Sequence, residues 1–123
     1  MANRDQHTPL RSVELHILLS VVDQPRHGYA ILLETEERTN GQPGFEIPTL
    51  YRALRRLRDS GLVRSAAAPE VDVDQRREYW VATEPGRRAL EAELVRLEAT
   101  VALGRARIRH ASAAKQATAR GGK

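Results

Sequence analysis

The residues best suited to chemistry in this sequence lie between positions 49 and 66, a segment with five arginines and one aspartate. Arginine side chains form forked hydrogen bonds with phosphate groups and with the O6 and N7 atoms of guanine, and hydroxyl groups bind phosphate oxygens. If this segment is a helix that buries its leucines, its polar residues lie on one exposed face. The predicted polyanion-binding residues of that face are Thr49, Tyr51, Arg52, Arg55 and Arg56.

The alternative interpretation of this face is an ordinary solvated helix surface. The chain contains 18 arginines and only two lysines, so arginine-rich surfaces are expected wherever its helices are exposed. A polyanion-binding surface therefore needs support from the elements that surround the segment.

The charge of the chain is unevenly distributed along its length. The net charge is +4, but residues 104–123 contain six basic and no acidic residues. The preceding part holds the other 14 basic residues and all 16 acidic residues, a net charge of −2. Any anion-binding face there must come from a local arrangement of side chains, since the global charge does not provide one.

The composition excludes several classes of site. Without cysteine there is no disulfide, no thiolate metal ligand and no thiol nucleophile, and the expected compartment is the cytoplasm. The four histidines lack metal-ligand spacing, and the sequence has no Gly-x-Ser-x-Gly motif. The sequence predicts neither a signal peptide nor a membrane-spanning segment. We therefore expect a cytoplasmic single-domain protein that is not an enzyme, with no metal, no cofactor and no membrane partner.

Three helices are expected in the first half of the chain, at residues 12–23, 27–39 and 48–59. His27 is expected to orient the start of the second helix, and Pro48 suits the first turn of the third. The residues expected to be buried are Leu15, Leu18, Leu19 and Val22 in the first helix, Tyr29, Leu32 and Leu33 in the second, and Leu50, Leu54 and Leu57 in the third.

Two short strands are expected next, at residues 62–67 and 77–82, and the charged segment between them is too long for a tight turn. They predict a two-stranded ribbon with Trp80 packed beneath it, so the fold class is mainly α with a small β-hairpin (α+β). Three helices followed by such a ribbon is the order of a winged helix-turn-helix, whose recognition helix enters the major groove of DNA. The tip of the wing adds Arg76 and Arg77 to the predicted DNA-binding residues.

A fourth helix is expected from Thr83, which provides a cap, with Pro85 in the first turn. Its apolar residues recur at steps of four, three and four, the spacing of a coiled-coil seam, so the expected partner is a second copy of the chain. The predicted dimer-interface residues are Leu90, Leu94, Leu97 and Val101. The predicted organisation is a flexible leader at 1–11, a winged-helix DNA-binding domain at 12–82, a dimerisation helix at 83–109 and a basic disordered tail at 110–123.

Four segments resemble the PadR family of bacterial transcriptional regulators, namely HGYAI at 27–31, TLYRALRRL at 49–57, DSGLV at 59–63 and REYWVATEPGRRAL at 77–90. The resemblance covers roughly residues 8–105 and is to the small members with a single C-terminal dimerisation helix. It implies a winged helix-turn-helix homodimer that binds double-stranded operator DNA, usually a repressor released by a small-molecule effector. The rival interpretation is a winged-helix protein–protein adaptor whose arginines are only solvated.

Overall fold

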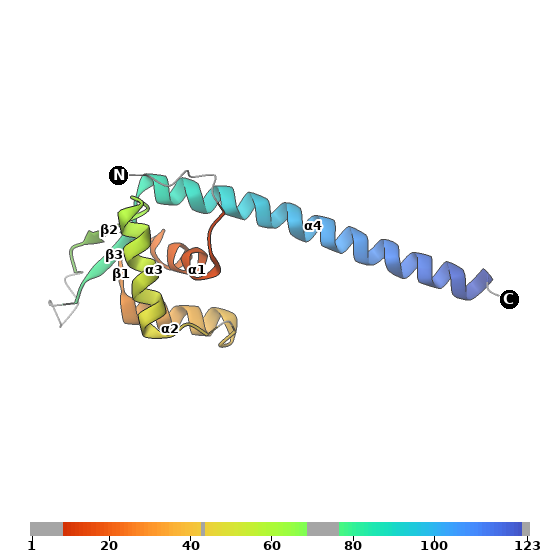
Figure 1. Cartoon of the computed structure of the whole chain (residues 1–123), viewed down its shortest axis with the longest axis horizontal. Coiled ribbons are helices and arrows are strands. Elements are labelled where there is room, and N and C mark those ends of the chain that lie inside the picture. Colours follow the sequence, from red (N-terminus) through yellow and green to blue (C-terminus); the bar gives the residue numbers. More distant parts are fainter. Residues whose placement is uncertain (1–8, 43, 69–76, 122–123) are drawn as a thin grey trace. The chain divides into compact units, whose positions relative to one another are not determined.

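The computed structural model of the chain describes residues 9–42, 44–68 and 77–121 and divides into two compact units, Met1–Glu93 and Leu94–Lys123. The elements in chain order are α1 (Ser12–Val21), β1 (Arg26–His27), α2 (Gly28–Thr39), α3 (Ile47–Asp59), β2 (Val63–Ala66), β3 (Tyr79–Ala82) and α4 (Glu84–Gly121) (Figure 1). A mainly helical chain with one small antiparallel sheet confirms the predicted fold class.

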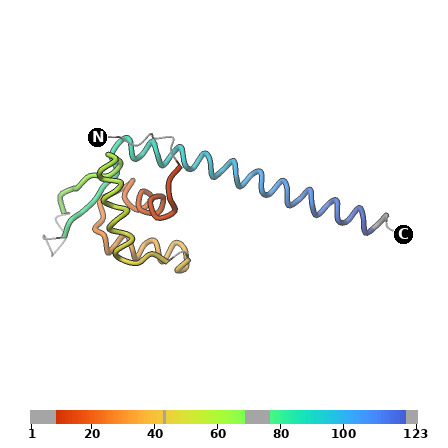
Figure 2. Tube along the Cα trace, viewed as in Figure 1, coloured from red at the N-terminus to blue at the C-terminus, as the bar shows by residue number. Residues whose placement is uncertain are grey.

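The core of the first unit forms where α1 contacts α2, α3 and β3. Figure 2 shows the three helices gathered beside the strands. Ile17, Leu18, Ile31, Leu54 and Leu57 are all fully buried there. Burial of each such side chain stabilises the fold by about 1.5–3 kcal/mol, so this core is what holds α3 in place.

The buried surface of α1 differs from the predicted one. Val22 is 37 % exposed, and Leu15 and Leu19 are only partly buried. Because α1 packs against both α2 and α3, its buried surface is wider than a single stripe at helical spacing. That surface comprises Val13, Glu14, Ile17, Leu18, Ser20 and Val21.

His27 begins α2, as predicted. Its Nδ1 atom accepts a hydrogen bond of 3.1 Å from the backbone N–H of Ala30, which is the interaction of a helix N-cap residue. The predicted burial of Tyr29 and Leu33 is wrong, since these residues are 56 % and 46 % exposed. The helix meets its neighbours along a different face, which consists of Gly28, Ile31, Leu32 and Thr35.

The sheet contains three strands rather than the predicted two. β2 and β3 pair antiparallel, with Val63 opposite Ala82 and Ala66 opposite Tyr79. β1 pairs with the other edge of β3, and its two residues are too few to show the alternation that predicts a strand. Trp80 is 3 % exposed, which confirms its predicted burial against the sheet.

The leucine stripe of α3 is buried as predicted. Leu50, Leu54 and Leu57 are each at most 2 % exposed, and Pro48 occupies the first turn of the helix. Because these three leucines are buried on one side of α3, the opposite side of the helix faces solvent.

Thr83 caps α4, as predicted. Its Oγ1 atom accepts a hydrogen bond of 3.1 Å from the backbone N–H of Gly86. A Cβ atom at Gly86 would lie 2.9 Å from the carbonyl carbon of Leu62, so glycine is required for this close approach. Leu90 is 4 % exposed and belongs to the core of the first unit, so its side chain is not available to the predicted dimer interface.

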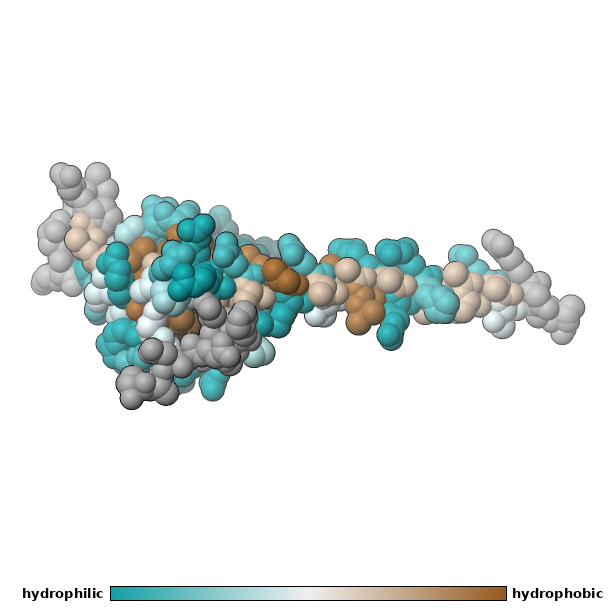
Figure 3. Space-filling model, turned by 90° about the horizontal axis from the view of Figure 1, so that it is seen from above, coloured by the Kyte–Doolittle hydropathy of each residue, from teal (hydrophilic) through white to brown (hydrophobic). Residues whose placement is uncertain are grey.

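The second unit contains the remainder of α4. The helix continues through Gly121, although the sequence predicts a disordered tail from residue 110. Alanine, the residue with the highest helix propensity, occupies five of the ten positions from 111 to 120 and explains the difference. Figure 3 shows hydrophobic residues in brown at intervals along this helix, between hydrophilic residues in teal.

Candidate nucleic-acid interface

The five predicted polyanion-binding residues of α3 lie in unequal environments. Arg52 and Arg55 are exposed, Tyr51 is 38 % exposed, and Thr49 and Arg56 are half-buried. All five residues therefore lie on one helix, but the exposed fraction of the side chain differs from one residue to the next.

Arg52 and Arg55 are the exposed arginines of α3 that have no acidic partner among the described residues. In the part of the chain that the structure describes, neither forms an ion pair, and Arg55 has no hydrogen-bond partner. Arg52 Nη2 donates a long hydrogen bond of 3.4 Å to Thr49 Oγ1, which orients the guanidinium near the start of α3. Arg58, by contrast, lies 3.3 Å from the carboxylate of Asp59. Among the arginines of α3, those available to an external anion are thus Arg52 and Arg55.

Arg56 is tied to the core of the first unit. Its Nε atom lies 3.5 Å from Oε2 of Glu14, a residue of α1 whose side chain is fully buried. The other carboxylate oxygen of Glu14 accepts a hydrogen bond of 2.9 Å from the backbone N–H of Arg11. Glu14 was not among the predicted residues, although a glutamate at the third position of a helix is the signal of a capping box.

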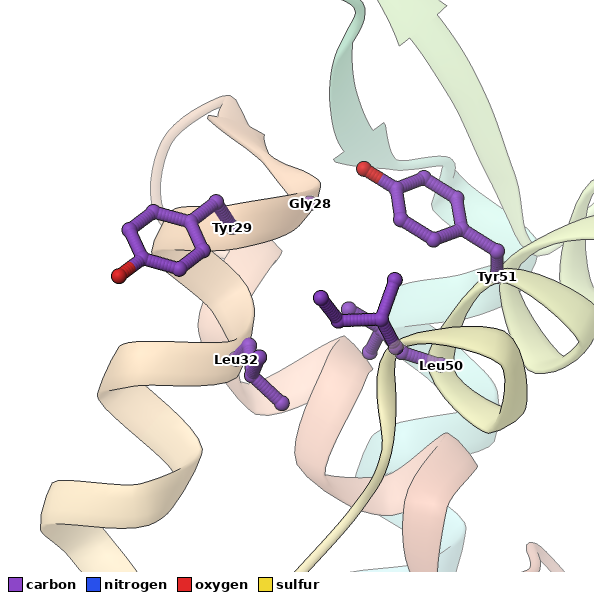
Figure 4. Close-up of a pocket in the computed structure, with 6 residues that line it drawn as sticks. Gly28, Tyr29, Leu32, Leu50 and Tyr51 are labelled. Atoms are coloured by element: carbon purple, nitrogen blue, oxygen red, sulfur yellow. The ribbon is translucent and has the colours of Figure 1, made fainter.

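Tyr51 lies against the first turn of α2. A Cβ atom at Gly28 would lie 2.7 Å from Cζ of Tyr51, so a larger residue here would displace the ring from this position. Figure 4 shows the ring of Tyr51 directed towards Gly28. The start of a helix carries partial positive charge and unpaired N–H groups, which attract anions.

Arg77 lies at the same end of α2. Its Nη1 atom is 3.0 Å from Nε2 of His27, and its side chain is exposed. Arg77 and Tyr51 thus contact two successive residues, His27 and Gly28, and the structure brings these two predicted site residues together. Arg76 lies outside the described residues.

The arrangement suits a polyanion and offers little to other chemistry. Hydroxyl groups, guanidinium groups and helix N-termini are among the groups that bind backbone phosphates in protein–DNA complexes. Within the described ranges, no group of three or more His, Asp or Glu side chains could hold a metal ion. No helix there has the length and apolar character needed to cross a membrane.

His16 of α1 contacts Arg38 of α2, whose Nη1 atom lies 3.0 Å from Nδ1 of the imidazole. Partial burial, and then the positive charge of Arg38, lower the pKa of His16 from its ordinary value of 6.5. The neutral form of the imidazole therefore predominates at pH 7. Because arginine only donates, Nδ1 of His16 must be the unprotonated nitrogen in this contact.

The second unit exposes the other three residues of the predicted dimer interface. Leu94 and Leu97 are each 38 % exposed, and Val101 is 51 % exposed. Ile108, which is 68 % exposed, follows Val101 by one heptad and was not predicted. It extends the same seam beyond the last predicted interface residue, because residues seven apart lie on the same side of a helix.

Comparison with known proteins places these features in a family. The model of the transcriptional regulator PadR-like family matches residues 17–92. A transcriptional regulator from Clostridium thermocellum is 25% identical, with a TM-score of 0.63 over 74% of this chain and 84% of that chain. A PadR family transcription regulator from Clostridium difficile is 21% identical, with a TM-score of 0.70 over 80% of this chain and 99% of that chain.

The fold is also that of a structure containing DNA. Bacillus subtilis PadR in complex with operator DNA is 20% identical, with a TM-score of 0.60 over 71% of this chain and 48% of that chain. The comparison with curated proteins gives no significant match.

Proposed function

The chain belongs to the PadR-like family of transcriptional regulators, and we propose that it is a repressor that binds a specific operator as a homodimer. Members of this family are transcriptional regulators and not enzymes. The observation that carries the proposal is the exposed pair Arg52 and Arg55, on a helix whose opposite face is fully buried. Repression, and release by a small-molecule effector, follow from the resemblance to the small PadR regulators.

The N-terminal half of α3 is the part that reads bases in this proposal. In helix-turn-helix proteins that part of the recognition helix enters the major groove. Arg52 lies there and is assigned to a guanine, while Arg55 and Tyr51 are assigned to phosphates. Arg56 reaches a phosphate only with the guanidinium nitrogens that Glu14 does not engage. The wing residues assigned to the DNA backbone are Arg76 and Arg77.

The exposed seam of the second unit supports the homodimer. Leu94, Leu97, Val101 and Ile108 present apolar surface at heptad spacing. Covering each side chain with a second helix is worth up to about 1.5–3 kcal/mol. A two-fold dimer presents two copies of α3 to successive major grooves, so we expect a palindromic operator with half-sites about 10 base pairs apart.

Fluorescence anisotropy in a salt series tests this proposal against the protein–protein adaptor. Labelled DNA from upstream of the protein's own gene, and duplexes that the protein enriches from a random library, are compared with scrambled DNA. We expect Arg52→Ala to lower operator affinity by about 10- to 100-fold and to relax the preference at one base pair. Arg55→Ala should weaken binding to every sequence and reduce the salt slope by about 1.

The matched control is Arg87→Ala, which removes a 60 % exposed arginine of α4. It should bind like the wild type, apart from the small effect of one lost charge. A wild type that prefers no sequence would exclude a specific operator. If both α3 variants bind with unchanged affinity and salt slope, the arginine face is only solvated. The adaptor interpretation then takes its place.

A further inference from the structure

An apolar pocket lies beside the arginines of α3, and none of the residues that line it is charged. It has a volume of about 70 Å³. Leu32 and Leu50 form its floor, being 8 % and 2 % exposed, and the more exposed Tyr29, Ile47 and Tyr51 form its rim. Figure 4 shows Tyr29 of α2 and Tyr51 of α3 on either side, with Leu32 and Leu50 between them. The lining residues are Gly28, Tyr29, Leu32, Ile47, Leu50 and Tyr51.

Two of the three rim residues, Ile47 and Tyr51, lie in the part of α3 that is assigned to the major groove. Ile47 is the first residue of α3 and is 52 % exposed, and Tyr51 follows it by four residues on the same side of the helix. Arg52 adjoins Tyr51 in the chain. A duplex held by Arg52 and Arg55 therefore brings the edges of its bases to the mouth of the pocket.

The chemistry of the major groove identifies the occupant. Base edges there present hydrogen-bond donors and acceptors, and one apolar substituent, the C5-methyl group of thymine. The pocket is large enough for a group of this size, because its volume of about 70 Å³ exceeds the ~10–15 Å³ that a cavity needs to hold one water molecule. It is also well below the ~300–1,000 Å³ of pockets that hold drug-sized ligands. The pocket therefore accommodates a methyl group but not a drug-sized effector.

We propose that this pocket, here called the methyl pocket, selects thymine at one position of each half-site by enclosing its C5-methyl group. Ile47 is the residue that sets this preference, because it is the exposed aliphatic side chain of the rim. The inference rests on the proposed DNA-binding function. It adds an apolar specificity contact to the hydrogen bonds assigned to Arg52.

Uracil substitution tests the methyl pocket directly. The full-length protein first enriches its preferred duplex from a random library, and each thymine of one half-site is then replaced in turn by uracil, which removes only the methyl group. At one position we expect affinity to fall by about three- to fivefold, the loss that corresponds to one buried methyl or methylene group. Ile47→Ala should bind the thymine duplex correspondingly more weakly and no longer distinguish it from the uracil duplex.

Leu33→Ala is the matched control, because Leu33 is a 46 % exposed leucine of α2 that does not line the pocket. It should keep the full discrimination against uracil. Uracil tolerated at every position, an enriched duplex without thymine, or undiminished discrimination in Ile47→Ala would overturn the methyl pocket while leaving DNA binding intact. A library without any enriched sequence would overturn the proposed function and this inference together. Should Ile47→Ala fail to fold, the uracil series on the wild type decides the question.

Discussion

Replacing Arg56 by alanine tests whether this arginine serves the core of the first unit more than the DNA. The substitution removes the cation 3.5 Å from Glu14, a fully buried carboxylate that keeps its hydrogen bond from the backbone of Arg11. Leaving a buried polar group without one of its partners costs about 1–3 kcal/mol, whereas an exposed ion pair is worth about 0–1 kcal/mol. Because Arg56 is 35 % exposed and the contact is long, we expect the free energy of unfolding to fall by about 1–2 kcal/mol.

Urea unfolding followed by far-UV circular dichroism measures this loss. All variants are compared at one protein concentration, because the stability of a dimer depends on it. Arg52→Ala and Arg55→Ala are the matched controls, and each should change stability by less than about 0.5 kcal/mol because both side chains are exposed. Glu14→Gln in the Arg56→Ala background should recover part of the loss, since glutamine keeps an acceptor without a charge. Equal unfolding midpoints for Arg56→Ala and Arg52→Ala would refute the reasoning.

Three further predictions concern assembly, the basic end of the chain and pH. Leu94→Asp with Leu97→Asp should give monomers in sedimentation velocity, while Leu103→Asp, 54 % exposed but outside the heptad spacing, should leave the dimer intact; a dimeric double variant would exclude this seam. Deleting residues 111–123, which carry three basic and no acidic residues, should weaken binding to operator and scrambled DNA alike, and a loss confined to the operator would contradict this. Because the pKa of His16 is lowered by folding, the stability that its neutral imidazole contributes should be present above pH 6.5 and be lost as pH falls towards the folded pKa; His16→Gln should lose less stability over that window, and an identical pH profile would argue against it.

The order of elements could be predicted from the sequence, but the buried faces could be predicted only where a helix packs on one side. The leucines of α3 follow one stripe, and Leu50, Leu54 and Leu57 are buried as expected. α1 contacts two helices and a strand, so single-stripe periodicity selected Val22 and overlooked Glu14. The sequence contains no pattern that predicts strand β1, because the extended conformation of its two residues results from pairing with β3.

The division of roles along α3 could not be predicted either, because it depends on residues far away in the sequence. Arg52, Arg55 and Arg56 are chemically identical, and what distinguishes Arg56 is a glutamate 42 positions earlier. The ring of Tyr51 likewise occupies the space that a side chain at Gly28 would take. In both cases the contact crosses from α3 to another helix, which helical periodicity within residues 47–59 does not encode.

Because of these contacts, only some of the predicted DNA-binding residues of α3 are free of a structural role. Helical spacing places Arg52 and Arg55 opposite the leucine stripe, whereas Arg56 lies at the edge that meets α1 and Tyr51 at the edge that meets α2. Residues at the centre of the exposed face do not contact another helix and remain open to an external ligand. Residues at its edges contribute to the fold and to recognition at once. Substitutions at Arg52 or Arg55 should therefore change binding alone, while those at Arg56 should change stability and binding together.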